Sequence, residues 1–143
     1  MDPERLQAVC QLRLTCRQHQ SEWIILRAER TNVLITAPDA MVDAVVVALL
    51  PDLRRPMYAW AREGALPAPH EVGTLLIRDV GRLSLDQQRA LLSWLNPPAV
   101  LGHIQVVSTT AFEVFSLVAQ GVFLEALYYR LNTVRLDMLE SEC

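Results

Sequence analysis

Two charged residues at the end of an apolar run stand where catalysis would be expected. Residues 73–77 read GTLLI, which is typical of a buried parallel strand, and Arg78 and Asp79 follow. Adjacent carboxylates at the end of such a strand hold Mg²⁺ and polarise water in nucleotide hydrolases. Because residue 78 is an arginine, we expect Arg78 and Asp79 to form a local ion pair at the strand end, without a catalytic role for Asp79.

The basic residues of the chain are informative because of one absence. All 13 are arginines among 143 residues, and the formal net charge is −3. A Walker A phosphate loop needs a lysine to reach the terminal phosphates of a nucleotide, and this sequence has none. The arginines are spread along the chain instead of forming a stripe, so we expect no direct contact with nucleic acid.

Side chains that could bind a metal are few and scattered. They are Cys10, Cys16 and Cys143, with His19, His70 and His103. The three cysteines form no CxxC pair, which favours reduced thiols in a cytosolic chain over a zinc site or a disulfide. We therefore expect no metal and no cofactor. No apolar run is long enough to span a membrane and the N-terminus lacks a signal-peptide core, so we expect a cytoplasmic protein.

The elements that must position these residues alternate between strands and helices. The sequence predicts strands at 33–36, 57–60, 74–79, 103–109 and 133–137, and helices at 21–31, 39–50, 84–95, 111–119 and 123–131. Residues 4–19 have a loosely helical pattern, with a strand at 12–16 as the alternative. Ser84 and Gln87 have the spacing of a capping box, and Gly121 should end a helix in the left-handed conformation. This alternation predicts a single α/β domain over residues 1–143, with a parallel sheet and helices on both faces.

Three segments then resemble a known family. They are Gly73 to Ile77, Gly81 to Leu95 and Gly121 to Leu136, the last reading GVFLEALYYRLNTVRL. Together they resemble the AAA+ domain of sigma-54-dependent transcriptional activators, the bacterial enhancer-binding proteins. The likeness covers about residues 22–138 and is strongest over 72–138. It implies a three-layer αβα fold whose sheet of about five strands has the order 5-1-4-3-2.

The resemblance places a phosphate loop after the strand at 33–36, and this loop is altered. The family has a glycine-rich segment ending in Gly-Lys, whose N–H groups cradle phosphates. This chain has Ala37, Pro38 and Asp39 there, and Asp43 stands where the lysine would be. Pro38 removes a donor and Asp43 would repel a polyphosphate. We expect Asp43 to be a solvated acid in the first turn of a helix.

The other catalytic positions implied by the resemblance are also changed. Arg78 takes the place of the metal-binding Asp of Walker B, and Asp79 takes that of the catalytic Glu. The sensor Asn falls at Ala111. The family's first finger arginine is Leu124 here, the adjoining Asp is Ala126, and the second arginine is retained as Arg130. Two readings of Arg130 stay open: a finger acting on a neighbouring subunit, or a structural arginine paired with a nearby carboxylate.

Two larger parts of the family pattern are missing from this sequence. Only about a dozen residues separate Trp60 from Gly73, so the insertion with the GAFTGA loop that touches the sigma factor is not expected. The sequence ends soon after the last predicted strand, so we expect no helical lid.

Three functions remain open at this stage. The leading hypothesis is a catalytically inactive AAA+-like module that regulates by binding protein, either itself or an active sigma-54-dependent activator. The alternatives are a structural scaffold or homodimer in an unrelated assembly, and residual ATP binding without hydrolysis. The chain could also be an excised core of a longer regulator.

Overall fold

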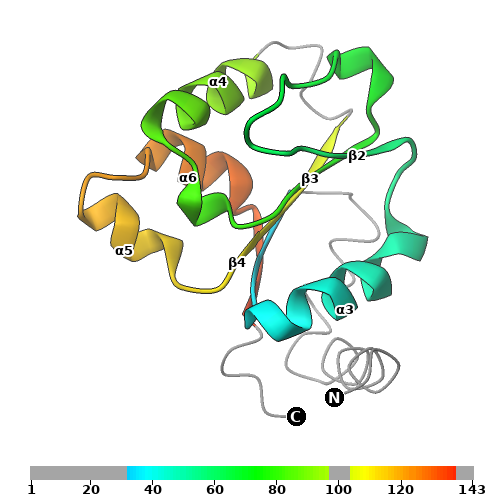
Figure 1. Cartoon of the computed structure of the whole chain (residues 1–143), viewed down its shortest axis with the longest axis horizontal. Helices are drawn as coiled ribbons and strands as arrows, with labels where there is room; N and C mark the ends of the chain where they lie inside the picture. Colours follow the sequence, from blue (N-terminus) through cyan, green and yellow to red (C-terminus); the bar gives the residue numbers. More distant parts are fainter. Residues whose placement is uncertain (1–31, 97–103, 138–143) are drawn as a thin grey trace.

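A computed structural model describes residues 32–96 and 104–137 and contains strands and helices in alternation (Figure 1). The strands are β1 (Val33–Thr36), β2 (Met57–Ala59), β3 (Thr74–Ile77), β4 (Gln105–Thr110) and β5 (Val134–Asp137). The helices are α3 (Asp39–Leu49), α4 (Leu85–Leu95), α5 (Val114–Ala119) and α6 (Glu125–Leu131), with short 3₁₀ turns η1 (Leu50–Asp52), η2 (Pro69–Glu71) and η3 (Val80–Arg82). The helices predicted at 4–19 and 21–31, the three cysteines, His19 and His103 lie outside the described residues.

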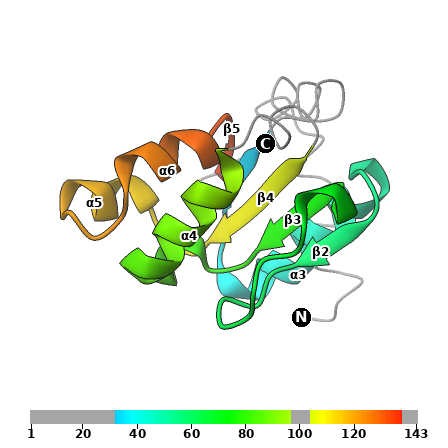
Figure 2. The same ribbon diagram turned by 90° about the horizontal axis from the view of Figure 1, so that it is seen from above.

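The five strands form one sheet in the order β2-β3-β4-β1-β5, and every neighbouring pair is parallel (Figure 2). This is the predicted order 5-1-4-3-2 read from the other edge, so the prediction is confirmed. In the centre, Val33 of β1 lies in register with Val107 of β4 and Val134 of β5. Parallel strands bring their carboxyl ends to one edge of a sheet, which is where α/β proteins bind their ligands.

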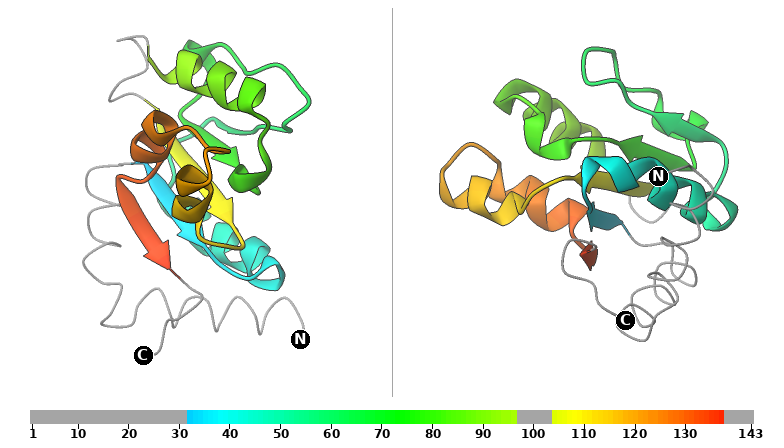
Figure 3. Two further views of the ribbon diagram at one scale, coloured as in Figure 1. Left: turned by 90° about the vertical axis from the view of Figure 1, so that its left-hand side faces the viewer. Right: turned by 60° about the horizontal axis from the view of Figure 1, so that its bottom comes forward.

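Successive residues of each strand point to opposite faces, and each face has its own core. Helix α3 covers one face of the sheet (Figure 3). Its buried side chains join Ile35, Leu76, Val107 and Leu136 in one cluster. Seven residues of this helix are buried, as its apolar composition predicts: Met41, Val42, Ala44, Val45, Val46, Ala48 and Leu49.

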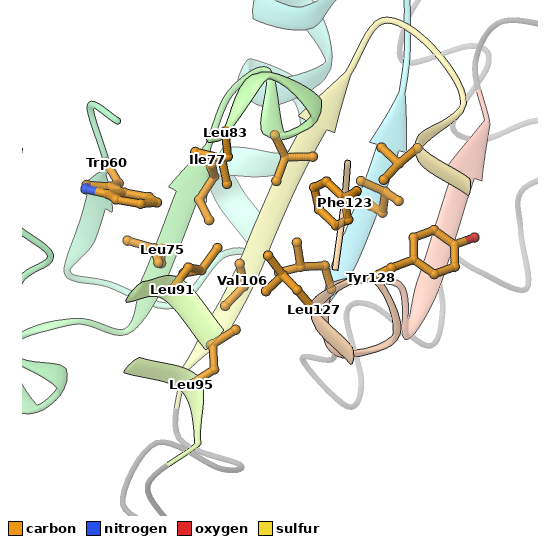
Figure 4. Packing of buried hydrophobic residues seen from close by; sticks show 14 of the residues in the cluster. Trp60, Leu75, Ile77, Leu83, Leu91, Leu95, Val106, Phe123, Leu127 and Tyr128 are labelled. Carbon is orange, nitrogen blue, oxygen red and sulfur yellow. The ribbon is translucent and has the colours of Figure 1, made fainter. Parts of the chain in front are cut away.

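Helices α4, α5 and α6 cover the opposite face, so the domain has the predicted three layers. Leu75, Ile77 and Val106 of the sheet meet Leu91 of α4 and Leu127 of α6 in a second cluster (Figure 4). Trp60 joins the same cluster and donates its indole N–H to the carbonyl of Gly64 at 2.8 Å. Its role is packing, as expected for a buried tryptophan with a polar tip.

Local signals set several element ends. The capping box at the start of α4 is confirmed: Ser84 Oγ accepts from Gln87 N at 3.1 Å, and Gln87 Oε1 accepts from Ser84 N at 2.8 Å. Gly121 has φ +77° after α5, also as predicted. Helix α5 begins at Val114 and not at 111, because Thr110 Oγ1 bonds both backbone groups of Phe112 and holds a turn there.

Gly73 is required by a close approach between two chain segments. A Cβ added to it would lie 2.6 Å from the carbonyl oxygen of Arg55 and 2.7 Å from Cγ of Arg54. Its own N–H donates to the carbonyl of Pro56 at 2.8 Å. The glycine therefore lets the segment before β2 lie directly against the start of β3.

Candidate functional site

Most of the positions singled out by the sequence converge at the carboxyl edge of the sheet. The N–H of Ala37, just after β1, donates to the carbonyl of Thr110 at the end of β4 at 2.9 Å. The N–H of Asp79, after β3, lies 3.4 Å from Oγ1 of Thr109. The structure thus brings the two segments that the resemblance aligns with Walker A and Walker B together beside the strand that leads to Ala111.

The position of the phosphate loop is filled by a helix. Helix α3 begins at Asp39 with Pro38 as its N-cap, so the residues aligned with the loop are already helical. Met41 and Val42 are 8% and 7% exposed and belong to the core under α3. The N–H of Ala37 is bonded to Thr110, and Pro38 has none. A phosphate cradle made of free N–H groups is therefore not formed by Ala37 and Pro38.

Asp43 lies in the second turn of α3, so its predicted place in the first turn is wrong. The helix begins at Asp39, as the sequence predicted, and the apolar residues at 40–42 continue it, so Asp43 is its fifth residue. The Asp43 side chain is 78% exposed, as expected for a solvated acid.

Arg78 forms an ion pair with Asp43 and not with Asp79, so the predicted local pair is wrong. The cation at the position of the metal ligand thus meets the anion at the position of the phosphate-loop lysine. The side chains are 51% and 78% exposed, which places the pair at the surface of the edge.

The backbone explains why Asp79 does not pair with Arg78. Asp79 has φ 53° and ψ 49°, the left-handed conformation, and it caps the η3 turn. This conformation ends β3 at Ile77, two residues before the predicted end. It also turns the backbone at Asp79 away from the direction of the strand.

Ala111 follows β4 as expected and is half-buried. A methyl group offers no hydrogen bond to water or phosphate, so the polar function of a sensor residue is not present at this position.

Arg130 lies at the other edge of the sheet. Its Nη2 donates to the carbonyl of Leu95 at 2.5 Å and its Nη1 donates to Oδ1 of Asn96 at 3.0 Å, both at the end of α4. Asn32, which precedes β1, donates from Nδ2 to the Arg130 carbonyl at 2.9 Å. The guanidinium therefore contacts the end of a helix of its own chain instead of the carboxylate that the structural reading expected.

The two remaining positions of the finger segment lie at the opposite end of α6 from Arg130. Leu124 is the N-cap of α6 and is half-buried, and Ala126 is exposed in the first turn. Neither side chain has a group that could contact a phosphate.

Two polar residues that organise this region were not identified from the sequence. Asn32 accepts from Val106 N at 2.8 Å while it donates to Arg130, and so joins β1, β4 and α6. Gln88 is fully buried; its amide nitrogen donates to the carbonyls of Leu83 and Val122, both at 3.0 Å, and its oxygen accepts from Leu124 N at 2.7 Å. The only signal for Gln88 was its place in the family pattern.

Arg135 on the edge strand β5 has two carboxylate partners. It donates to Glu113 at 2.9 Å and to Asp137 at 3.2 Å. Partial burial lowers the pKa of this guanidinium, but Glu113 and then Asp137 raise it more, and the pKa ends above its ordinary value. Arg135 therefore stays charged at any physiological pH.

Over residues 32–96 and 104–137, no group of three or more His, Cys, Asp or Glu side chains could hold a metal ion. Nor does this part of the chain contain a helix long and apolar enough to cross a membrane.

Comparisons with known proteins identify the fold and the family. The family model described as the sigma-54 interaction domain matches residues 25–140. NtrX from Brucella abortus in complex with ADP matches with a TM-score of 0.64 and 20% identity, covering 94% of this chain and 41% of NtrX. The ATP complex of the same protein gives 0.59 and 19%, covering 91% and 36%.

A more distant structure, Drosophila ORC bound to GC-rich DNA and Cdc6, gives a TM-score of 0.53 at 12% identity, covering 94% of this chain and 57% of the other. A search of curated proteins finds no match. The chain spans about two fifths of the NtrX chain, and these low identities show the fold alone. Since the family model covers most of the sequence, the chain belongs to the sigma-54 interaction domain family, whose core has the AAA+ fold.

Proposed function

We propose that this chain is a sigma-54 interaction domain without nucleotide binding or hydrolysis, acting as a cytoplasmic regulatory module that binds protein. The observation that carries the proposal is the start of α3 at Asp39. A phosphate loop needs non-helical backbone with free N–H groups, and here the aligned residues form a helical turn with Met41 and Val42 in the core. Opening that turn would expose apolar side chains to water.

The electrostatics of the same edge support the proposal. Asp43 would repel the phosphates that a lysine attracts, and Arg78 would repel Mg²⁺. Removing one charge stabiliser from a phosphoryl-transfer site costs orders of magnitude in rate, and here the lysine, the metal ligand and the sensor side chain are all replaced.

Calorimetry tests the loss of nucleotide binding directly. Titration of the purified chain with ATP and Mg²⁺ should give no saturable heat. NtrX from Brucella abortus, whose solved structure holds ADP, is the positive control under the same conditions. Binding of ATP in the micromolar range would overturn the proposal and favour residual ATP binding without hydrolysis.

The protein-binding part of the proposal is supported by an aromatic surface on α5 and α6. Phe115 and Tyr129 are 51% and 61% exposed, and each packs against the buried Tyr128 with ring centroids 5.9 and 5.4 Å away. Large exposed aromatic side chains held on a rigid base are typical of protein interfaces.

The proposed partner is a sigma-54-dependent activator, and the test uses purified proteins. The chain is titrated into such an activator from the same organism, and complex formation is followed by light scattering. The variant Phe115→Ser/Tyr129→Ser should weaken binding at least about tenfold, as expected for two interface aromatics. A chain that forms only its own dimer, with no activator complex, would favour the scaffold alternative.

A further inference from the structure

The end of α4 lacks a basic residue of its own. Helix α4 has no Lys, Arg or His in its last turn, and its C-cap, Asn96, stays in the right-handed helical conformation. The last carbonyls of a helix have no partner within it, and they carry the negative end of the helix dipole. A cation supplied from elsewhere would stabilise this end.

Arg130 supplies that cation from α6. Its two guanidinium nitrogens contact the Leu95 carbonyl and the Asn96 side chain, at 2.5 and 3.0 Å. The Arg130 side chain is half-buried, and its carbonyl is held by Asn32. The backbone carbonyl and the guanidinium of Arg130 therefore both form hydrogen bonds within its own chain.

Helices α4 and α6 are consequently joined by polar contacts at two places. Gln88, in the first turns of α4, bonds the segment that leads into α6, and Arg130, in the last turn of α6, bonds the end of α4. Between these two places, Leu91 of α4 and Leu127 of α6 belong to one hydrophobic cluster (Figure 4). The Arg130 guanidinium is therefore the polar link between the end of α4 and the end of α6.

We infer that Arg130 is a helix-capping residue that fixes the end of α4 on α6, and that a protein bound beside it gains no free catalytic cation from Arg130. The second part rests on the proposed function as a protein-binding module. It means that such binding would withhold an arginine from a partner's active site instead of supplying one.

The test measures thermal unfolding and amide exchange of the full chain. Arg130→Ala should lower the melting temperature by about 3 to 6 °C, and should speed exchange in the last turn of α4 about tenfold. Arg130→Lys keeps the charge but loses the fork of donors, so it should fall between the wild type and Arg130→Ala.

Arg89→Ala is the matched control. Arg89 lies on α4, the helix that Arg130 contacts. It pairs with Asp86 at 3.0 Å, but its side chain is 61% exposed. Its loss should leave both readouts within error. If Arg130→Ala changes the melting temperature and the amide exchange no more than Arg89→Ala does, the inference is wrong. If Arg130→Ala does not fold, the comparison of Arg130→Gln with Arg130→Lys serves the same purpose. Nucleotide titration does not involve Arg130, so failure of the proposed function would be seen separately.

Discussion

Asp43 on α3 and Arg78 after β3 form an ion pair in which both charges are opposite to those of the family pattern. An anion stands where the phosphate-loop lysine would be, and a cation stands where the metal ligand would be. The ion pair joins helix α3 to the end of β3, and under the proposed function these two charges would also disfavour phosphate and Mg²⁺.

Exchanging the two charges tests whether charge or backbone prevents nucleotide binding. The double variant Asp43→Lys/Arg78→Asp restores the signs of the family pattern and retains an ion pair. We expect its stability to lie within about 1 kcal/mol of the wild type, because the pair is exposed. We also expect no ATP binding by calorimetry, since α3 still occupies the place of the loop.

The single variant Asp43→Lys is the control for the exchange. It puts two cations together and should lower the free energy of unfolding by about 0.5 to 1 kcal/mol. ATP binding by the double variant would show that the charges, and not the helical turn, prevent binding.

The sequence predicted this edge in outline because the signals that define it are local. The apolar runs, the capping box at Ser84 and the glycine at position 121 act within a few residues, and all three were confirmed. The partner of Arg78 could not be predicted, because it depends on how α3 packs against the sheet and on how the backbone turns at Asp79. Both are properties of packing instead of spacing.

The left-handed backbone of Asp79 leads to a second prediction. Asp and Asn tolerate this conformation, whereas a β-branched residue clashes with its own carbonyl. Asp79→Asn should keep the free energy of unfolding within about 0.5 kcal/mol, and Asp79→Val should lower it by about 1 to 2 kcal/mol. Urea unfolding measures both. Equal stability of the two variants would mean that the turn relaxes.

Buried polar contacts far apart in the sequence were the least predictable part of the fold. Asn32 reads as a helix stop in the sequence, yet it bonds groups on β4 and α6. Gln88 reads as an ordinary polar residue of a capping segment, yet it is fully buried. A single sequence contains no local pattern that distinguishes such a residue from a solvated one.

Gln88 provides a third prediction. Gln88→Met has a similar volume but leaves the N–H of Leu124 and the carbonyl of Val122 without their partner. The free energy of unfolding should fall by about 2 to 4 kcal/mol, because unsatisfied buried groups cost more than the hydrogen bonds gain. The half-buried neighbour provides the control: Gln87→Met loses its bonds to Ser84 N and to the carbonyl of Arg62, and should cost about 1 kcal/mol. Similar losses in both variants would contradict a special role for Gln88.

Arg135 gives a prediction for pH. Partial burial lowers the pKa of its guanidinium, but Glu113 and Asp137 raise it more, so the pKa lies above its ordinary value. A raised pKa in the folded state means that the stabilisation is complete below the unfolded value and is lost only as the pH rises beyond it. Arg135→Gln should therefore reduce stability by about 1 kcal/mol or less, equally at about pH 6 and about pH 9. A loss that changes between these values would show that another group controls the pair.

Two buried hydroxyl groups of the sheet should respond in opposite ways to removal. Ser108 Oγ on β4 has no hydrogen-bond partner, and the residue is 0% exposed, lying in register with Ile77 and Leu34. Thr74 on β3 is equally buried, but its Oγ1 donates to the carbonyl of Arg54 at 2.7 Å.

Ser108→Ala removes an unpaired polar group and should raise the free energy of unfolding by about 0.5 to 1 kcal/mol. Thr74→Val keeps the shape but leaves the carbonyl without this donor, so it should lower the same quantity by about 1 to 2 kcal/mol. Urea unfolding of both variants measures the difference, and a destabilised Ser108→Ala would indicate that the hydroxyl has a partner, such as a buried water.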